Sequence, residues 1–430
     1  MGELKRDDQF ITQNFDFEWW PDHSYGPQSG INHFEAAQCL TFASCDIYHP
    51  SQDELTGMEI AYGGDATRPL LHAPYLVMET QSQAFKQWTP YPGQLRLQAM
   101  AHLASGAMGI AYWNLFSLHN SAESYWKGVL SHDLEEGRIA REIGAIGADF
   151  AKLSPHLAGA TKHSRVALVI DNHSQSALRW FAIDPGCSYN DLVMWAYSCL
   201  YELNVECDVV DVEALVPSDY DLIVTPGLYC ASQQVIDGLR AFVEKGGVLV
   251  STLRSFVSDE NVTIWRTRAP HDLTYVFGML YQEIAKPGTT TVAGKPAQRM
   301  IELLIADDAE VLERYEHRYW GEYAALTANS FGKGRAYYLA TVGTKDLLKS
   351  VLRRACADAG IGLAHEWPLV VRSLRAADGS SIHFAMNFSA DVRGFANPFG
   401  EVTDLLGGKA YEAGQTIDLH DWDVVVLKEA

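Results

Sequence analysis

The sequence predicts an α/β protein in three regions, with boundaries near residues 162 and 367. Three observations support this fold class. Short apolar runs alternate with helical patterns in residues 1–162, and a second alternation of this kind fills residues 163–367. Residues 368–430 contain short strands and glycine turns without a helical pattern. We therefore expect a parallel sheet, then an open α/β domain, then a small antiparallel β domain.

The first region contains four candidate strands that end near polar or aromatic residues. They are FITQNF at 10–15, LTFASCDIYHP at 40–50, PYLVMET at 74–80 and GIAYWNLF at 109–116, with a helical pattern at 93–107. Because strands that alternate with helices form parallel sheets, we expect the functional residues at the carboxyl ends of these strands.

The second and third regions give further strands. The second region has RVALVID at 165–171, ECDVVD at 206–211, YDLIVTPG at 220–227, GGVLVSTL at 246–253 and GRAYYLAT at 334–341, spaced by helical patterns such as 233–247. The third region has VVRSLRAADGSSIHFAMNFS at 370–389 and the alternating run TIDLHDWDVVVLKE at 416–429.

Composition and charge exclude several classes of protein. The chain has 33 Lys and Arg residues against 54 Asp and Glu residues, a net charge of −21 that disfavours nucleic acids and anionic membranes as partners. No apolar window is long enough for a membrane helix, and the start lacks the apolar core of a signal peptide. The seven cysteines are scattered and never form a C-x-x-C pattern, which predicts a cytoplasmic protein without a disulfide framework or zinc site. The histidines lack ligand spacing, so we expect no metal.

Glu79 is the first candidate for chemistry because it directly follows the buried run YLVM. A carboxylate at the end of a parallel strand is either functional or a satisfied structural anion. Six aromatic residues recur near the predicted strand ends: Trp88, Tyr91, Tyr112, Trp113, Tyr125 and Trp126. Aromatic faces beside carboxylates suit sugar rings, although an aromatic-rich core is the alternative interpretation. Asp46, Tyr48 and Glu123 lie in comparable positions near loops.

Cys230, in TPGLYCAS, follows a strand of the second region, where amidotransferase-like folds place a nucleophilic cysteine. The strained turn around such a nucleophile needs small flanking residues, and Tyr229 precedes Cys230 here. We therefore expect Cys230 to be buried and inert.

Long stretches of the chain carry a family resemblance. In the first region they are FITQNF, HFEAAQCLTFASCDIYHPSQDELTG, VMETQ followed by WTPYPGQLRLQAMAHLASGA, and ESYWKGVLSHDLE. RVALVID, LYCASQQVIDGLRAFVEKGGVLVSTLRSFVSDEN and the β tail follow in order. These stretches resemble glycoside hydrolase family 42, the β-galactosidases. The resemblance implies the C-terminal half of a (β/α)8 TIM barrel, strands five to eight, then an amidotransferase-like trimerisation domain and a C-terminal β domain.

The resemblance also implies an activity and a set of site residues. The reaction would be retaining hydrolysis of terminal β-D-galactosides by a homotrimer that needs no cofactor. Glu79 matches the family's nucleophile, Tyr48 a tyrosine that approaches it, and Trp88 a tryptophan of the galactose subsite. Glu123 matches a carboxylate that holds sugar hydroxyls, and Trp113 and Trp126 are expected to bind substrate as well.

The sequence departs from the family pattern in two places. Leu115 and Phe116 replace polar or aromatic residues that usually follow the tyrosine of strand eight. The family's acid/base glutamate follows an asparagine at the end of strand four, and no such strand precedes FITQNF in this chain. A retaining glycosidase needs two carboxyl groups roughly 5–5.5 Å apart, so we expect one of the pair to be absent.

Three hypotheses remain open. In the first, the chain is the C-terminal part of a β-galactosidase, and activity requires an N-terminal half barrel on a separate chain or lost from the gene model. In the second, it is a non-catalytic sugar-binding or assembly module. In the third, two half barrels pair to close an eight-stranded barrel.

Overall fold

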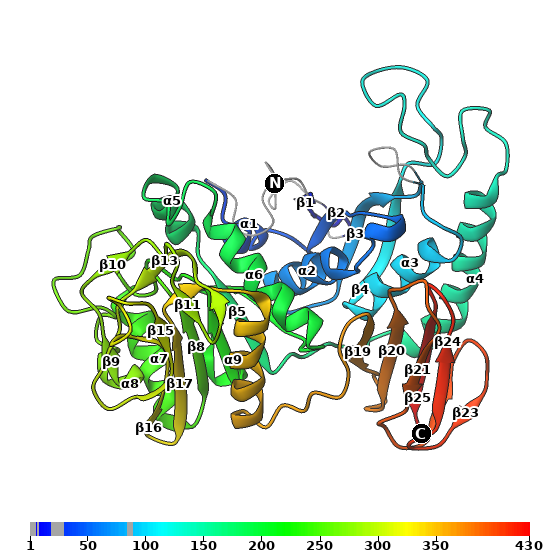
Figure 1. The fold of residues 1–430 in the computed structure, drawn as a ribbon. Helices are drawn as coiled ribbons and strands as arrows, with labels where there is room; N and C mark the ends of the chain where they lie inside the picture. Colours follow the sequence, from blue (N-terminus) through cyan, green and yellow to red (C-terminus); the bar gives the residue numbers. More distant parts are fainter. Residues whose placement is uncertain (1–5, 7, 19–29, 84–88) are drawn as a thin grey trace. The chain divides into compact units, whose positions relative to one another are not determined.

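The computed structural model describes residue 6 and residues 8–18, 30–83 and 89–430 (Figure 1). Contacts divide the chain into two compact units. Unit 1 contains the chain up to residue 24 together with 35–163 and 364–430, and unit 2 contains 25–34 and 164–363. The chain therefore crosses between the units near residues 24, 34, 163 and 363. None of the helices in the described ranges is long and apolar enough to cross a membrane.

Unit 1 contains a parallel four-stranded sheet in the order β1-β2-β3-β4. Its strands are β1 (Asn14–Glu18), β2 (Ser44–Tyr48), β3 (Tyr75–Gln81) and β4 (Ala107–Trp113). The four strands expected from the sequence are thus confirmed. The predicted ends were wrong in two places, since β1 begins four residues later than FITQNF and β4 ends before Leu115 and Phe116. Those two side chains are 55% and 53% exposed; Phe116 forms an isolated bridge with Leu130, whose N–H donates to the Leu115 carbonyl at 2.9 Å.

Four helices of the described residues accompany this sheet. They are α1 (His33–Ala37), α2 (Met58–Thr67), α3 (Gln94–Ala104) and α4 (Arg138–Leu157), with short 3₁₀ turns at Gln52–Glu54 and Arg68–Leu70. α2 and α3 are buried almost all round, whereas α4 buries one face. Leu95 and Ala99 of α3 form a buried cluster with Ile139 and Ile146 of α4. The spacing of seven residues between the two isoleucines places them on one face of α4, which is how this helix covers the end of the sheet.

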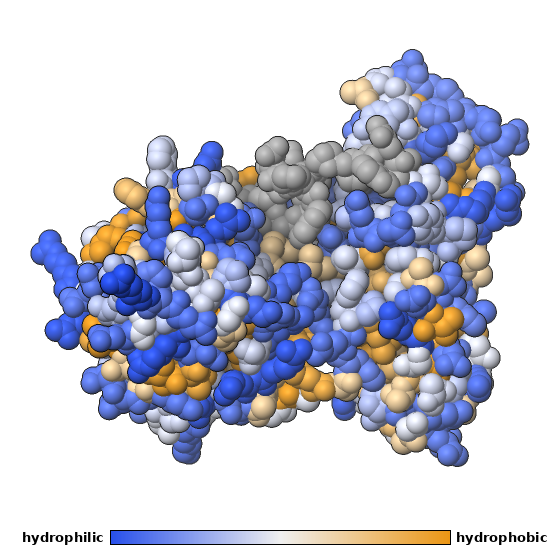
Figure 2. Space-filling view, viewed as in Figure 1, coloured by the Kyte–Doolittle hydropathy of each residue, from blue (hydrophilic) through white to orange (hydrophobic). Residues whose placement is uncertain are grey.

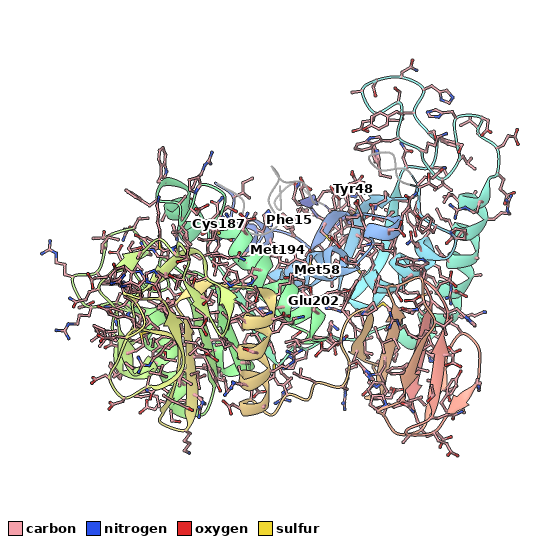
Figure 3. All side chains as sticks on the ribbon, in the orientation of Figure 1. Phe15, Tyr48, Met58, Cys187, Met194 and Glu202 are labelled. Atoms are coloured by element: carbon pink, nitrogen blue, oxygen red, sulfur yellow. The ribbon has the colours of Figure 1, made fainter. Side chains whose placement is uncertain are left out.

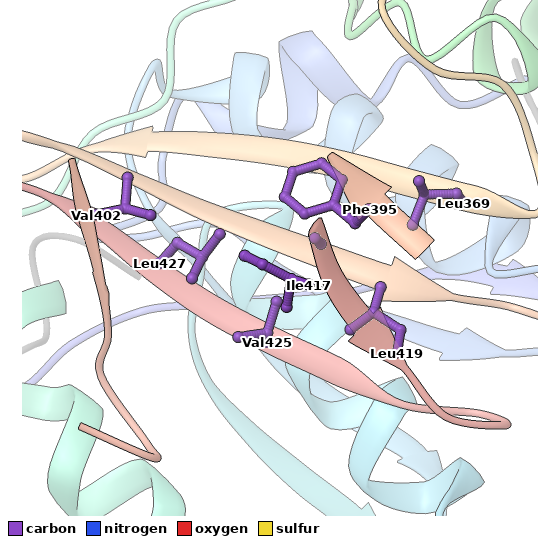
Figure 4. Close-up of a cluster of buried hydrophobic side chains, with 8 residues drawn as sticks. Leu369, Phe395, Val402, Ile417, Leu419, Val425 and Leu427 are labelled. Atoms are coloured by element: carbon purple, nitrogen blue, oxygen red, sulfur yellow. The ribbon is translucent and has the colours of Figure 1, made fainter. Parts of the chain in front are cut away.

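The C-terminal strands form an antiparallel β domain within unit 1, as the sequence predicts. They are β19 (Leu369–Arg375), β20 (Ser381–Asn387), β21 (Arg393–Ala396), β22 (Val402–Asp404), β23 (Ala410–Tyr411), β24 (Thr416–Leu419) and β25 (Val424–Glu429). Their core gathers alternate apolar residues from both sheets, among them Phe395, Ile417 and Leu427 (Figure 4). Thr161 exchanges two backbone hydrogen bonds with Arg375 of β19, both at 2.8 Å, which joins the β domain to the end of the helical region.

Unit 2 is a nine-stranded mixed sheet in the order β12-β11-β15-β16-β17-β8-β7-β5-β6. Its parallel part contains β5 (Val166–Ile170), β6 (Asp208–Asp211), β7 (Leu222–Thr225), β8 (Val248–Thr252) and β17 (Gly334–Leu339), all five expected from the sequence. The helices are α5 (Asn172–Trp180), α6 (Tyr189–Glu202), α7 (Gln233–Lys245), α8 (Thr274–Phe277) and α9 (Lys345–Asp358), with a 3₁₀ turn at Pro217–Asp219.

The expectation that helical patterns separate all these strands is wrong in two places. Only the 3₁₀ turn at Pro217–Asp219 lies between β6 and β7, and α8, of four residues, is the one helix between β8 and β17. That stretch is mainly antiparallel strand: β9 (Met279–Leu280), β10 (Ile284–Ala285), β11 (Thr291–Val292), β12 (Lys295–Pro296), β13 (Gln298–Glu302), β14 (Ile305–Ala306), β15 (Glu310–Glu316) and β16 (Ala324–Phe331), with β18 (Thr341–Val342) after β17. β15 alternates weakly because charged residues stand at both ends and in its middle, so its strand character is hidden in the sequence.

Candidate active site

Acidic residues are in register across three neighbouring strands of unit 1. Asp16 of β1 is in register with Asp46 of β2, and Asp46 is in register with Glu79 of β3, just after a bulge. Asn14 donates from Nδ2 to both carboxylate oxygens of Asp46, at 3.0 and 3.2 Å. Glu79 is half-buried, so its carboxylate remains reachable from outside.

Tyr48 holds the Glu79 carboxylate directly. Its phenol donates to Oε2 of Glu79 at 2.9 Å, and Figure 3 labels Tyr48 at the end of β2. Burial and then the charge of Glu79 raise the pKa of Tyr48 far above its ordinary value. The phenol is therefore protonated at neutral pH and donates its hydrogen bond to Glu79.

Trp126 and Glu123 lie on the same side of the site. The ring of Trp126 stands 6.4 Å from the ring of Tyr48, centre to centre, at an angle of 49°. The charge of Glu123 contributes to the raised pKa of Tyr48, which places this carboxylate within electrostatic reach of the phenol. Four of the predicted residues, Tyr48, Glu79, Glu123 and Trp126, are thus brought together by the fold.

The loop that carries Glu123 and Trp126 is pinned at several points between residues 114 and 132. Gln83, just after β3, donates to the carbonyl of Gly128 at 2.5 Å. The hydroxyl of Ser117 donates to the carbonyl of Leu130 at 2.8 Å. His132 Nε2 lies 2.7 Å from the Ser124 carbonyl and 3.1 Å from the Leu118 carbonyl. The loop is therefore held by hydrogen bonds within itself and to Gln83.

Gln81 is a residue of the site that our sequence interpretation missed. Its side-chain amide donates to the carbonyl of His49 at 2.5 Å and accepts from the His49 backbone N–H at 3.4 Å. Both residues are buried. The amide thus clamps the residue next to Tyr48 to the strand that carries Glu79. The available signal was its position two residues after Glu79, because alternate residues of a strand share a face.

The remaining predicted residues have different surroundings. Trp113 ends β4, is 38% exposed and pairs in register with Gln81. Trp88 falls outside the described residues, so its predicted role stays a prediction. Tyr91 donates to Asp53 at 3.1 Å on the surface, away from the contacts described above.

The cysteines and the possible metal ligands of the described residues are arranged as follows. All seven cysteines are free thiols. Burial raises the pKa of the Cys230 thiol to about 12, so it is held in its unreactive protonated form at neutral pH. No group of three or more His, Cys, Asp or Glu residues among the described positions is arranged to hold a metal ion.

Carboxylates and aromatic rings gathered near the carboxyl ends of parallel strands are common in glycoside hydrolases. Residues 3–153 match the family model described as β-galactosidase, and residues 164–362 match the one described as the β-galactosidase trimerisation domain. The chain belongs to glycoside hydrolase family 42 and corresponds to part of the length of its members.

Curated relatives support the same assignment. β-Galactosidase LacZ of Lactobacillus acidophilus is 25% identical over 421 residues, covering 94% of this chain and 62% of the relative. β-Galactosidase BglY of Alicyclobacillus acidocaldarius is 29% identical over 416 residues, covering 89% of this chain and 59% of the relative. The chain therefore spans about three-fifths of the length of the curated relatives it matches.

Solved structures share the fold. Gan42B, a family 42 β-galactosidase from G. stearothermophilus, superposes with a TM-score of 0.87 at 24% identity, over 98% of this chain and 64% of that one. The β-galactosidase of Bacillus circulans sp. alkalophilus gives a TM-score of 0.85 at 25% identity, over 93% and 62% of the two chains.

Proposed function

We propose that this chain carries the nucleophile part of a retaining β-galactosidase, with Glu79 as the nucleophile. The observation that carries the proposal is the contact of Glu79 Oε2 with the phenol of Tyr48 at the carboxyl ends of neighbouring parallel strands. The contact leaves the other carboxylate oxygen, Oε1, available to attack a sugar. Family membership supports the reaction type.

In the proposed reaction, one oxygen of Glu79 attacks the anomeric carbon while the bond to the leaving oxygen breaks. The product is a covalent galactosyl ester of Glu79, which water then hydrolyses with retention of configuration. The Tyr48 phenol fixes the orientation of the carboxylate throughout. We propose that Trp126 offers a ring face to the C–H side of the galactose, and that Glu123 binds its hydroxyls.

We further propose that the acid/base carboxyl comes from outside the four-stranded sheet. The partner carboxyl of a retaining enzyme lies roughly 5–5.5 Å from the nucleophile, across the sugar. The family pattern puts it on the strand that would lie beyond β1. It would then belong to a further part of a longer protein or to a second chain, and the sheet would be barrel strands five to eight.

Trp88 and Trp113 complete the proposed sugar subsite, and residues 163–367 are the proposed trimerisation domain. The family-model match over residues 164–362 supports oligomerisation through this part of the chain. A trimer of identical chains is the assembly that we propose, with a β-galactoside as the substrate.

An activated aryl 2-deoxy-2-fluoro-β-D-galactoside tests the nucleophile, because a good leaving group needs no protonation. We expect mass spectrometry to find one galactosyl adduct, mapped to the peptide that holds Glu79. Glu79→Gln should abolish the adduct. Glu135→Gln removes an exposed carboxylate of the neighbouring segment and should leave labelling unchanged.

Two outcomes would contradict the proposal. A folded chain without an adduct would show that Glu79 is not competent, and calorimetric binding of galactose lost in Trp126→Ala would then favour a sugar-binding module. Turnover of lactose by the chain alone, at the roughly 1–1000 per second of ordinary enzymes, would show that it already holds an acid/base group.

A further inference from the structure

We propose that an aromatic pair in unit 2, Trp180 and Phe181, docks into a groove on the next copy of this chain. The groove is lined by residues 182–185, 284–288 and 297–300. This inference rests on the proposed trimer and names the surfaces that form it. We refer to the two features as the aromatic knob and the β10–β13 groove.

The aromatic knob is the most exposed large apolar pair among the described residues of unit 2. Trp180 ends α5 with 85% of its surface exposed, and Phe181 follows at 78%. Ser174, Ala177 and Leu178, in the preceding turns of the helix, are buried. The Phe181 N–H donates to the Ala177 carbonyl at 3.1 Å, so the backbone under the knob is fixed by the helix.

Adjacent aromatic side chains that are both exposed are typical of a surface that contacts another molecule. Each could bury about 150–250 Å² on contact, and aromatic residues are enriched in the cores of protein interfaces. Figure 2 shows apolar surface at the upper left, where Figure 1 places α5, β10 and β13. The knob therefore has the character of an interface anchor.

The β10–β13 groove lies directly beside the knob along the chain. Its volume is about 790 Å³, and its apolar lining includes Ile183, Pro185, Ile284, Pro287 and Met300. Arg299 of β13 binds Asp184 at 3.2 Å, which ties the segment after the knob to the groove wall. Ile284 is 48% exposed and presents further apolar surface at the groove.

A second copy of this chain is the occupant that fits these observations. A ring of three copies uses a heterologous contact, in which one surface of each copy meets a different surface of the next. A convex knob beside a concave groove supplies such a pair of surfaces on one chain. Both lie within residues 164–362, the part that matches a trimerisation domain.

Analytical ultracentrifugation of the full chain tests the proposal. We expect the wild type to sediment as a trimer at micromolar concentration. The double variant Trp180→Glu/Phe181→Glu and the groove variant Ile284→Asp should each dissociate, with the dissociation constant raised at least about 30-fold, as for the loss of an interface hot spot. Tyr319→Glu, which changes another exposed aromatic of unit 2, should remain trimeric.

Mixing the two dissociated variants gives a sharper result. The knob variant keeps its groove and the groove variant keeps its knob, so one intact contact remains and we expect 1:1 dimers. Variants that stay trimeric with native circular dichroism, or a mixture that stays monomeric, would overturn the docking. A monomeric wild type would overturn the trimer itself, whereas the labelling of Glu79 reports on catalysis independently.

Discussion

At the scale of single residues, the site depends on a neutral phenol held against a charged carboxylate. Tyr48 is buried, and the charge of Glu79 adds to burial in raising the pKa of its phenol. The protonated Tyr48 phenol stabilises the Glu79 carboxylate through a hydrogen bond, and it does not act as a nucleophile itself. The phenol also removes rotational freedom from Glu79, which a nucleophile needs if one oxygen is to face the anomeric carbon.

Tyr48→Phe tests this contact. The variant keeps the ring but loses the 2.9 Å hydrogen bond to Glu79. Hydrogen bonds to charged groups contribute about 1.5–3 kcal/mol, so we expect the first-order labelling rate of Glu79 to fall about 10- to 100-fold. Tyr125→Phe alters an exposed tyrosine of the nearby loop and should label at the wild-type rate. An unchanged rate in Tyr48→Phe would remove Tyr48 from the mechanism.

Asp211, at the end of β6, should make the stability of the protein depend on pH. Burial, with a smaller contribution from the charge of Asp171, raises its pKa to about 6, although Asn32 and the Glu213 N–H donate to its oxygens at 3.1 and 3.0 Å. The ordinary pKa is about 3.9. The folded state thus binds this proton more tightly, and the stabilisation is full below about pH 4 and lost as the pH rises through 6.

Urea unfolding of the wild type and of Asp211→Asn at pH 4.5 and 7 measures how much the Asp211 proton contributes to the free energy of unfolding. We expect the stability of the wild type relative to the variant to rise by about 2 kcal/mol on going from pH 7 to 4.5. Comparing the two proteins cancels the other titrating groups, such as His33, whose pKa burial lowers to about 4. A difference that does not change with pH would mean that Asp211 titrates normally.

At the scale of elements, apolar runs were enough to predict the four parallel strands of unit 1 and five strands of unit 2. They were not enough to set strand ends, because the ladder between β1 and β2 starts where Asn14 meets Ser44, which side-chain polarity does not reveal. The hydrogen bonds by which His132 holds the 114–132 loop could not be predicted from the sequence either. Its acceptors are backbone carbonyls, which every residue carries.

A buried ion network joins α2 to the C-terminal β domain. Asp65 accepts hydrogen bonds from Arg372 of β19 and from Arg68, the latter at 3.2 Å, and all three side chains are buried. Burial alone would raise the pKa of Asp65, but the two guanidinium charges outweigh it and lower the pKa. The network therefore stays charged at neutral pH.

Arg372→Met should destabilise unit 1 by about 3–5 kcal/mol, because it leaves part of a buried charge uncompensated. Denaturant unfolding at pH 7 gives the value. Arg375→Met, on the same strand but exposed, is the matched control and should change the stability by less than about 0.5 kcal/mol. Equal effects in the two variants would show that the ion network adds nothing to the attachment of the β domain.

At the scale of the whole molecule, net charge and exposed apolar surface have opposite effects on the association of identical chains. The net charge of −21 favours separation of identical chains, whereas the aromatic knob favours association. Composition alone favoured neutral or cationic ligands over nucleic acid, but it could not reveal the aromatic knob. Trp180 and Phe181 are ordinary apolar residues in the sequence, and only the fold shows that both are exposed at the end of α5.

This balance predicts an unusual response of the trimer to salt. Added salt shortens the distance over which charges act, from about 30 Å at 0.01 M to about 8 Å at 0.15 M, and so weakens the repulsion between like-charged chains. It also strengthens apolar contacts slightly when the anion is sulfate. We therefore expect the trimer's dissociation constant, measured by sedimentation, to fall as sodium chloride is raised from about 20 to 300 mM. An interface made of ion pairs would respond in the opposite direction, so weaker association at high salt would exclude an apolar contact as the main attraction.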